Sequence, residues 1–142
     1  CDGTHNPIAI KTMFKLIKDY DLVMTTRFKN KKMYQTWPIK RILITHMRYY
    51  LVRLLLGTKL DSSGGFRMYD LKKIKLEDIF LAKDNNYNFF LLITFLLENK
   101  NYKLTEIPIN LPFRTLGISK MRTQDIISGI FKLLKTFVIY RL

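Results

Sequence analysis

Two segments of the chain carry residue types that can bind a metal ion or a phosphate group. Asp2 shortly precedes Asn6-Pro7, a pair typical of a helix start, and a carboxylate there can hold Mg²⁺ or Mn²⁺, which prefer oxygen ligands and bridge to phosphates. Residues 61–67 read Asp-Ser-Ser-Gly-Gly-Phe-Arg. The paired glycines let the backbone approach a ligand, and the hydroxyls and Arg67 can hold phosphate oxygens. Each segment alone is also compatible with an ordinary turn.

A third segment, residues 114–120, gathers two cations, a hydroxyl and a glycine in one loop. Arg114 can make planar, bidentate contacts with phosphate, Ser119 adds a hydroxyl, and Lys120 adds a point charge. The segment is therefore a candidate phosphate clamp, although a solvated basic loop has the same composition. Other reaction types lack support, because the sequence has no zinc-binding Cys/His cluster, no convincing Ser-His-Asp order and no P-loop.

The charge of the chain points to anionic partners. Among 142 residues, 25 Lys and Arg stand against 11 Asp and Glu, a net charge of +14. Nucleotide phosphates, an acidic membrane surface and nucleic acid all suit such an excess, and a base-composition bias toward Lys, Ile and Asn would produce part of it without any partner. We do not expect nucleic acid, because no nucleic-acid motif is present and the aromatic residues do not alternate with cations.

The elements expected to position these segments alternate between helix and strand. Helix-start, apolar and turn signals predict helices over residues 8–18, 37–57, 76–82, 87–99 and 123–142, and strands over residues 21–26, 66–71 and 102–111. Pro108 favours an edge or a bend for the last strand. No repeat or linker interrupts the pattern, so we expect one α/β domain over residues 1–142.

The last predicted helix, residues 123–142, is amphipathic. Its apolar residues fall on one broad side, while Lys132 and Lys135 fall on the other. The helix has too few consecutive apolar residues to span a bilayer, so the pattern predicts either a helix in a membrane interface or a helix facing the core. Separately, the start at Cys1, the single cysteine, predicts a fragment or processed piece without an internal disulfide.

Taken in order, these segments resemble family 2 glycosyltransferases, closest to dolichol-phosphate mannosyltransferase and related polyprenyl-phosphate sugar transferases. Residues 1–7 are similar to the end of the family's Asp-x-Asp motif with its following Gly-Ser-His-Asp-Pro, and residues 26–28 to its Ser-Arg-Phe. Residues 54–57 and 61–69 are similar to Leu-Leu-Gly and to Asp-x-Thr-Ser-Gly-Phe-Arg-x-Tyr.

The resemblance continues to the end of the chain and implies a fold. Residues 106–109 are similar to the family's Glu-Val-Pro-Ile, and residues 114–120 to its Arg-x-x-Gly-x-Ser-Lys. Five modest motifs in the right order imply a GT-A fold, a Rossmann-like α/β sandwich. The half that binds the nucleotide would lie upstream of Cys1, so we expect a partial GT-A domain that is inactive on its own.

The resemblance also implies roles for individual residues. Asp2 would be the second metal aspartate, with Mg²⁺ or Mn²⁺ as the cofactor, and Asp61 would be the catalytic residue that orients groups near the anomeric carbon. Arg27 would bind the acceptor phosphate. His46, in a Thr45-His46 pair where the family often has Ser-Arg, would be a second acceptor contact. The nucleotide and its phosphates would be bound by Gly65, Arg67, Arg114, Ser119 and Lys120.

Two further positions depart from the family pattern. Phe90-Leu91-Leu92 stands where the family has Gln-x-Glu, and Gly64 replaces the usual Ser. These changes indicate a divergent member, with a different sugar or acceptor.

The implied reaction transfers a sugar of the mannose or glucose type from a nucleotide-sugar to a polyprenyl or dolichyl phosphate, with inversion. The enzyme would be peripheral, at the cytoplasmic face of a membrane. Two alternatives remain open at this stage: a family 2 enzyme with a polysaccharide or other non-lipid acceptor, and a non-catalytic basic fragment that binds membrane or nucleic acid.

Overall fold

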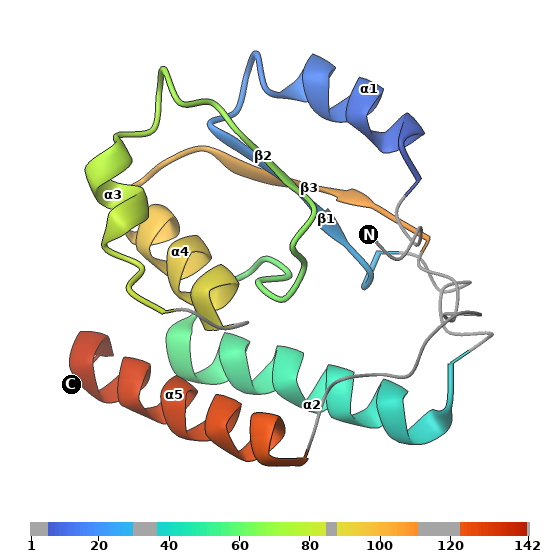
Figure 1. Ribbon diagram of the computed structural model, residues 1–142, viewed down its shortest axis with the longest axis vertical. Helices are drawn as coiled ribbons and strands as arrows, with labels where there is room; N and C mark the ends of the chain where they lie inside the picture. Colours follow the sequence, from blue (N-terminus) through green and yellow to red (C-terminus); the bar gives the residue numbers. More distant parts are fainter. Residues whose placement is uncertain (1–5, 30–36, 85–87, 111–122, 142) are drawn as a thin grey trace.

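The computed structural model describes residues 6–29, 37–84, 88–110 and 123–141 (Figure 1). Its elements follow the expected alternation of helix and strand, and their bounds are α1 Ile8–Leu16, β1 Leu22–Thr26, α2 Ile39–Leu56, β2 Arg67–Tyr69, α3 Leu76–Phe80, α4 Asn88–Asn99, β3 Leu104–Pro108 and α5 Thr123–Arg141. The predicted α/β class is confirmed.

The strands form a mixed sheet with β1 at its centre, in the order β2-β1-β3. β1 runs antiparallel to β2, with Val23 opposite Met68, and parallel to β3, with Val23 opposite Thr105. All five residues of β1 are buried, as expected for a strand covered on both faces. Pro108 ends β3, an edge strand, in agreement with the position predicted for it.

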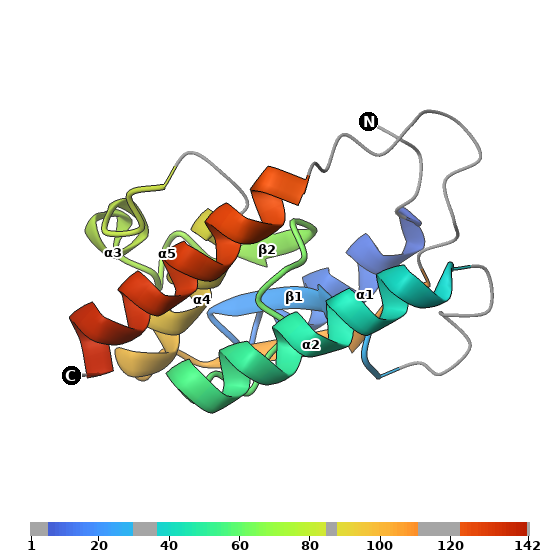
Figure 2. The same ribbon diagram turned by 90° about the horizontal axis from the view of Figure 1, so that it is seen from below.

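The alternation of β1 divides the core between the two faces of the sheet. Val23 packs with Met13 of α1 and with Ile107, whereas Leu22 and Met24 belong to the larger cluster formed with α2, α4 and α5. Figure 1 shows α1 on one side of the sheet and α4, α2 and α5 on the other. Figure 2 shows α2 and α5 side by side as the outermost elements of that second side.

The start of α1 and the end of α2 show why the sequence predicted these helix ends correctly. Asn6 Oδ1 accepts a hydrogen bond of 2.9 Å from the Ile8 N–H, so it satisfies one of the open donors of α1. Gly57 ends α2 with φ of 72°, a conformation that glycine adopts without cost, and its N–H bonds to Arg53 O at 3.0 Å. The predicted bounds of α1 and β2 were too long, because α1 ends at Leu16 and β2 covers only Arg67–Tyr69.

The terminal helix α5 does not bury the whole of its apolar side, as the core-facing alternative required. Leu133 and Thr136 are buried, and Lys132 Nζ lies 2.9 and 2.8 Å from the two carboxylate oxygens of Asp84. The predicted exposed basic face is therefore wrong for Lys132, because an ion pair with a distant carboxylate turns it toward the domain. Apolar side chains on the opposite side of α5 are exposed, namely those of Ile127, Phe131, Leu134 and Val138.

The end of α1 is held by a single ammonium group. Lys73 Nζ donates to the carbonyl oxygens of Ile17, Lys18 and Tyr20 at 3.0, 2.8 and 3.3 Å, and it lies 3.4 Å from Asp70 Oδ2. Carbonyls at the end of a helix lack intrahelical partners, so one cation satisfies several of them at once.

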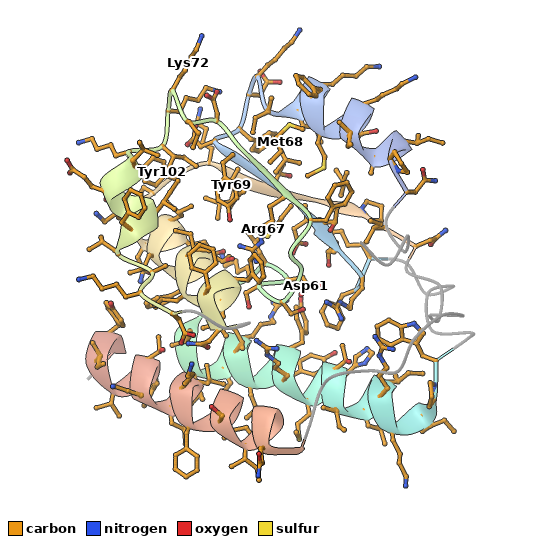
Figure 3. The ribbon with its side chains drawn as sticks, in the orientation of Figure 1. Asp61, Arg67, Met68, Tyr69, Lys72 and Tyr102 are labelled. Carbon is orange, nitrogen blue, oxygen red and sulfur yellow. The ribbon has the colours of Figure 1, made fainter. Side chains whose placement is uncertain are left out.

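We predict that Lys73→Met lowers the free energy of unfolding by about 1–3 kcal/mol, because carbonyls at the end of α1 lose a charged donor. Chemical denaturation followed by circular dichroism measures this change. Lys72→Met removes the same charge from a neighbouring side chain that points away from the domain (Figure 3) and should leave stability within about 0.5 kcal/mol of the unaltered chain. Equal stability of the two variants would contradict the role assigned to Lys73.

Candidate anion-binding site

The candidate site lies at the carboxyl end of β1, where the chain continues into Arg27. Arg27 follows the last residue of β1 directly, and the turn formed by residues 61–65 lies beside it. The Asp61 side chain is only 2% exposed, and its Oδ2 accepts a hydrogen bond from the Arg27 N–H at 3.3 Å and lies 3.4 Å from Arg27 Nε. A buried carboxylate therefore fixes both the backbone and the guanidinium of the arginine.

The other oxygen of Asp61 organises the turn itself. Oδ1 accepts hydrogen bonds from the Ser63 N–H at 3.1 Å and from Ser63 Oγ at 2.5 Å. Ser63 Oγ in turn accepts a bond of 3.0 Å from Arg27 Nη2. Arg27, Asp61 and Ser63 thus form a closed network, in which both oxygens of the carboxylate have partners inside the chain.

Glu106 of β3 is also bonded to this network. Its Oε1 accepts a hydrogen bond from the Asp61 N–H, and its Oε2 lies 3.5 Å from Lys29 Nζ. The Glu106 side chain is 6% exposed, and this burial raises the pKa of its carboxyl above the ordinary value, against the lowering effects of the Asp61 N–H and Lys29.

Arg67, predicted as a phosphate contact, has a clear structural role. Its Nε donates to Gly64 O at 2.7 Å, its Nη2 to Ser62 O at 3.1 Å and its Nη1 to Thr94 Oγ1 at 2.9 Å. The guanidinium also lies 5.0 Å from the centre of the Phe90 ring, and burial lowers its pKa. Arg67 therefore ties the turn to α4, and Figure 3 shows it close to Asp61. A direct phosphate contact for Arg67 stays a prediction.

The paired glycines of the turn are explained by neighbours within the chain. A Cβ on Gly65 would lie 3.2 Å from Phe90 Cζ, and a Cβ on Gly64 would lie 3.1 Å from Thr25 O. The close packing of the turn against α4 and β1 thus leaves little room for side chains at both positions. Phosphate binding by Gly65 also stays a prediction.

α2 forms the other wall of the site through aromatic contacts. The Phe28 ring stacks on Tyr49 with 4.0 Å between centroids and meets the His46 ring edge-on at 5.5 Å. His46 Nδ1 lies 3.0 Å from Ile42 O, a bond in which Nδ1 carries the proton because a carbonyl oxygen can only accept. Of the predicted acceptor residues, Arg27 therefore precedes Phe28 in the chain, and His46 contacts the Phe28 ring.

Sequence reasoning missed two arginines and a tryptophan near Arg27. The Trp37 ring has Arg41 Cζ at 4.0 Å and Arg27 Cζ at 5.9 Å from its centroid. Arg48 is half-buried, and its pKa is lowered first by burial and then by the positive charge of Arg27, while Asp61 acts in the opposite direction. We call Arg27, Arg41 and Arg48 the guanidinium cluster. The seven-residue spacing of Arg41 and Arg48 on one side of α2 was the available signal.

The guanidinium cluster can bind an anion. Guanidinium groups form bidentate hydrogen bonds with phosphate and carboxylate, and partial burial strengthens such bonds because it removes competing water. Asp61 is the carboxylate that compensates this positive charge in the described network, and its oxygens are already bound to Arg27 and Ser63. The arrangement therefore suits the binding and orientation of an anionic group such as a phosphate or a carboxylate.

Four predicted site residues, Asp2, Arg114, Ser119 and Lys120, lie outside the described residues. Within residues 6–29, 37–84, 88–110 and 123–141, no group of three or more His, Cys, Asp or Glu side chains is placed to hold a metal ion. The described part of the site is formed by α2, the end of β1, the turn of residues 61–65 and β3, and Arg67 of β2 ties that turn to α4.

Two bacterial proteins are similar to this chain over most of its length. No family model matches the chain. Polyprenol monophosphomannose synthase of Mycolicibacterium smegmatis is 26% identical over 133 residues, which cover 92% of this chain and 50% of the relative. Undecaprenyl-phosphate mannosyltransferase of Micrococcus luteus is 28% identical over 121 residues, which cover 84% of this chain and 50% of that relative.

The chain is similar over most of its length to two proteins named as polyprenyl-type phosphate mannose transferases. The resemblance found in the sequence to dolichol-phosphate mannosyltransferase-like enzymes of family 2 is confirmed by these relatives. The chain spans about half the length of the mannosyltransferases that it matches. The network of Arg27, Asp61 and Ser63 lies within the part of the chain that resembles them, since the matches cover most of its length.

We predict that Glu106→Gln makes the domain more stable above about pH 4.5, the ordinary pKa of a glutamate. Because the native pKa is raised, the unfolded chain loses its proton first, so stability falls as the pH rises from the ordinary value through the native one. Glutamine keeps an acceptor for the Asp61 N–H but cannot ionise. Denaturation curves from pH 4 to pH 8 measure this, with Glu77→Gln, an exposed glutamate of α3, as control. A Glu106→Gln variant less stable than the unaltered chain at pH 8 would contradict the prediction.

Proposed function

We propose that this chain is the carboxyl-side half of a GT-A glycosyltransferase domain that transfers a sugar from a nucleotide-sugar to a polyprenyl phosphate at a membrane surface. The observation that carries the proposal is the guanidinium cluster, oriented by buried Asp61 at the end of a sheet strand. The names of both relatives give a polyprenyl-type acceptor and a mannose group, and the guanidinium cluster suits an acceptor phosphate.

The acceptor in this proposal is a phosphate that is already anionic at neutral pH. It therefore needs a cationic binding site that orients one phosphate oxygen toward the anomeric carbon, more than it needs a strong general base. Arg27 provides this binding site, since Asp61 and Ser63 hold its guanidinium in one orientation. Asp61 acts in the reaction through Arg27, and His46 contributes from α2. Direct displacement at the anomeric carbon inverts its configuration.

The donor side of the proposal depends on residues outside the described part. Asp2 would hold Mg²⁺ or Mn²⁺, and a metal ion supplies charge stabilisation to a leaving diphosphate. The described residues do not make a metal site of their own, and both oxygens of Asp61 already have partners. Arg114, Ser119 and Lys120 would close over the donor phosphates and exclude water that otherwise hydrolyses the donor.

The membrane part of the proposal is supported by an apolar surface on two neighbouring helices. Five side chains of α2 are exposed along one stripe, and four of α5 along another. We define the α2–α5 apolar face as Ile39, Leu43, Met47, Tyr50, Leu54, Ile127, Phe131, Leu134 and Val138. Both stripes lie away from the core, and the helices pack against each other (Figures 1 and 2). An exposed apolar surface of this extent is typical of a protein or membrane contact.

A bilayer interface is the occupant that we propose for this face. The net charge of +14 favours anionic lipid, and exposed Lys135 lies beside the apolar stripe of α5. Lys132 does not contribute directly, because it is paired with Asp84. None of the described helices has the length and apolar character that a bilayer crossing requires. The face thus fits a helix pair that lies on the membrane, with α2 between the bilayer surface and the guanidinium cluster.

We predict that Arg27→Met lowers the rate of sugar transfer by about ten- to a hundredfold in the full-length gene product, because the acceptor phosphate loses a charged contact worth about 1.5–3 kcal/mol. The assay uses undecaprenyl phosphate, a panel of radiolabelled nucleotide-sugars and Mn²⁺ or Mg²⁺, with EDTA in a parallel arm. Lys15→Met, on exposed α1, is the charge-matched control and should keep full activity. Transfer to a soluble acceptor without lipid would overturn the lipid part of the proposal, and undiminished transfer with EDTA would overturn its metal part.

We predict that Leu54→Glu combined with Phe131→Glu weakens binding to anionic liposomes at least about tenfold without lowering thermal stability. The two side chains are 81% and 69% exposed, so the folded protein loses little packing while the interface loses two apolar contacts. Sedimentation with vesicles at low and high salt measures this.

The matched control for the liposome experiment is Phe14→Glu with Phe80→Glu, which changes two exposed apolar residues on α1 and α3. The control pair should bind liposomes nearly as well as the unaltered chain, apart from the same loss of net charge. Equal binding by both double variants would show that the α2–α5 apolar face does not contact lipid.

A further inference from the structure

The terminal helix α5 presents a strongly apolar side to the solvent. Apolar side chains on this side recur every three or four residues and, at about 100° per residue, lie within about 60° of one another around the helix axis. We call them the outer stripe of α5: Ile127, Phe131, Leu134 and Val138, all of them exposed. A helix of a globular domain ordinarily buries such a stripe, so α5 has the reverse of the usual orientation.

The side of α5 that faces the domain is mixed in character. Leu133 and Thr136 are buried, and Lys132 and Phe137 are half-buried. Leu133 and Phe137 join the larger core cluster. Thr136 Oγ1 donates to Lys132 O at 2.9 Å, so its hydroxyl hydrogen is satisfied within the helix. Apolar packing alone therefore gives α5 little reason to bury this side in preference to the outer stripe.

A charged contact favours the observed side. Lys132 Nζ donates to both carboxylate oxygens of Asp84, at 2.9 and 2.8 Å, and the Asp84 side chain is only 11% exposed. Asn88 Nδ2 of α4 donates to Asp84 Oδ2 at 3.3 Å, which joins this carboxylate to the rest of the domain. If α5 turned its outer stripe inward, the nearly buried carboxylate would lose its cation, a strongly unfavourable change.

We infer that the Lys132–Asp84 ion pair is a positioning contact, which holds the outer stripe of α5 outward, where a bilayer can contact it. A partly buried ion pair adds little net stability, but it can select one of several arrangements that apolar packing allows. Here it selects the arrangement in which the outer stripe lies beside the exposed apolar side chains of α2 (Figure 2). The inference rests on the proposed function, because it explains how the α2–α5 apolar face stays available to lipid.

The first experiment uses the opposite charges of the two residues. Lys132→Met lowers the net charge and Asp84→Asn raises it, so a purely electrostatic effect on binding to anionic vesicles would have opposite signs in the two variants. We expect both variants to bind vesicles of phosphatidylglycerol and phosphatidylcholine at least about threefold more weakly, because α5 is no longer held outward. The exchanged pair, Lys132→Asp with Asp84→Lys, keeps the net charge and should recover most of the affinity.

Two matched controls make the same charge changes elsewhere. Lys15→Met and Asp19→Asn alter exposed residues in α1 and shortly after it. Because α1 lies on the other side of the sheet from α2 and α5 (Figure 1), screening at about 0.15 M salt should keep both controls within about twofold of the unaltered chain. Melting temperatures establish that every variant is folded under the conditions of the binding assay.

The second experiment needs no membrane. Leu134→Cys in a Cys1→Ser background places the single thiol of the chain on the outer stripe. Asp84→Asn should slow the reaction of this thiol with a water-soluble maleimide at least about threefold, because α5 then turns the outer stripe toward the domain. Asp19→Asn in the same background should leave the rate unchanged.

Weaker vesicle binding by both single variants, recovery by the exchanged pair and slower thiol modification would support the inference. Stronger vesicle binding by Asp84→Asn, an exchanged pair that binds no better than the single variants, or single variants that do not fold would overturn it, because the pair would then act through net charge or stability alone. An unaltered chain that does not bind vesicles would overturn the membrane part of the proposed function, and slower thiol modification in Asp84→Asn would still support the orientation of α5 by the ion pair.

Discussion

The buried carboxylate of Asp61 is the interaction on which the rest of the candidate site depends. It lies between two segments that are distant in the sequence, the end of β1 and the turn of residues 61–65, and its oxygens bind groups from both. Because the carboxylate is almost fully buried, its charge is compensated chiefly by the Arg27 guanidinium. The position of Arg27 is therefore determined by a contact inside the domain before any ligand arrives.

The elements around this carboxylate keep it in place by different means. Glu106 binds the Asp61 N–H from β3, and Arg67 binds two carbonyls of the turn and Thr94 of α4. β2 and β3 therefore each supply a residue that contacts the network, and β1 leads directly into Arg27. Such pre-organisation favours anion binding, since the arginine loses little freedom when the anion binds.

Much of the fold was predictable because its signals are local. The apolar run of β1, the Asn6 cap and Gly57 at the end of α2 each depend on a few neighbouring residues, and each was found where expected. The bounds of short elements were less accurate, since the length of β2 depends on its pairing with β1. The α/β alternation itself follows from the order of these local patterns.

The site was predictable only where the family motifs name residues. Arg27 and Asp61 were each predicted as site residues and lie together, but Arg48 and Trp37 were missed because their proximity depends on how α2 crosses the end of β1. Which side of α5 faces the domain was also left open by the sequence. Helical periodicity shows which residues share one side of the helix. It does not show which side faces the domain, and here the pairing of Lys132 with Asp84, 48 residues away, decides this.

The sheet order has a consequence for how the chain is made. β1 is the central strand, but its parallel partner β3 follows only after α2, β2, α3 and α4, and the Lys103 N–H bonds to Asp21 across 82 residues. At about 5–20 residues per second, a ribosome needs roughly 4–16 seconds to synthesise that interval. During this time the most buried strand of the protein has no partner on one edge. Nascent β1 is therefore the segment that chaperones would need to shield, and folding of the sheet waits for the last third of the chain.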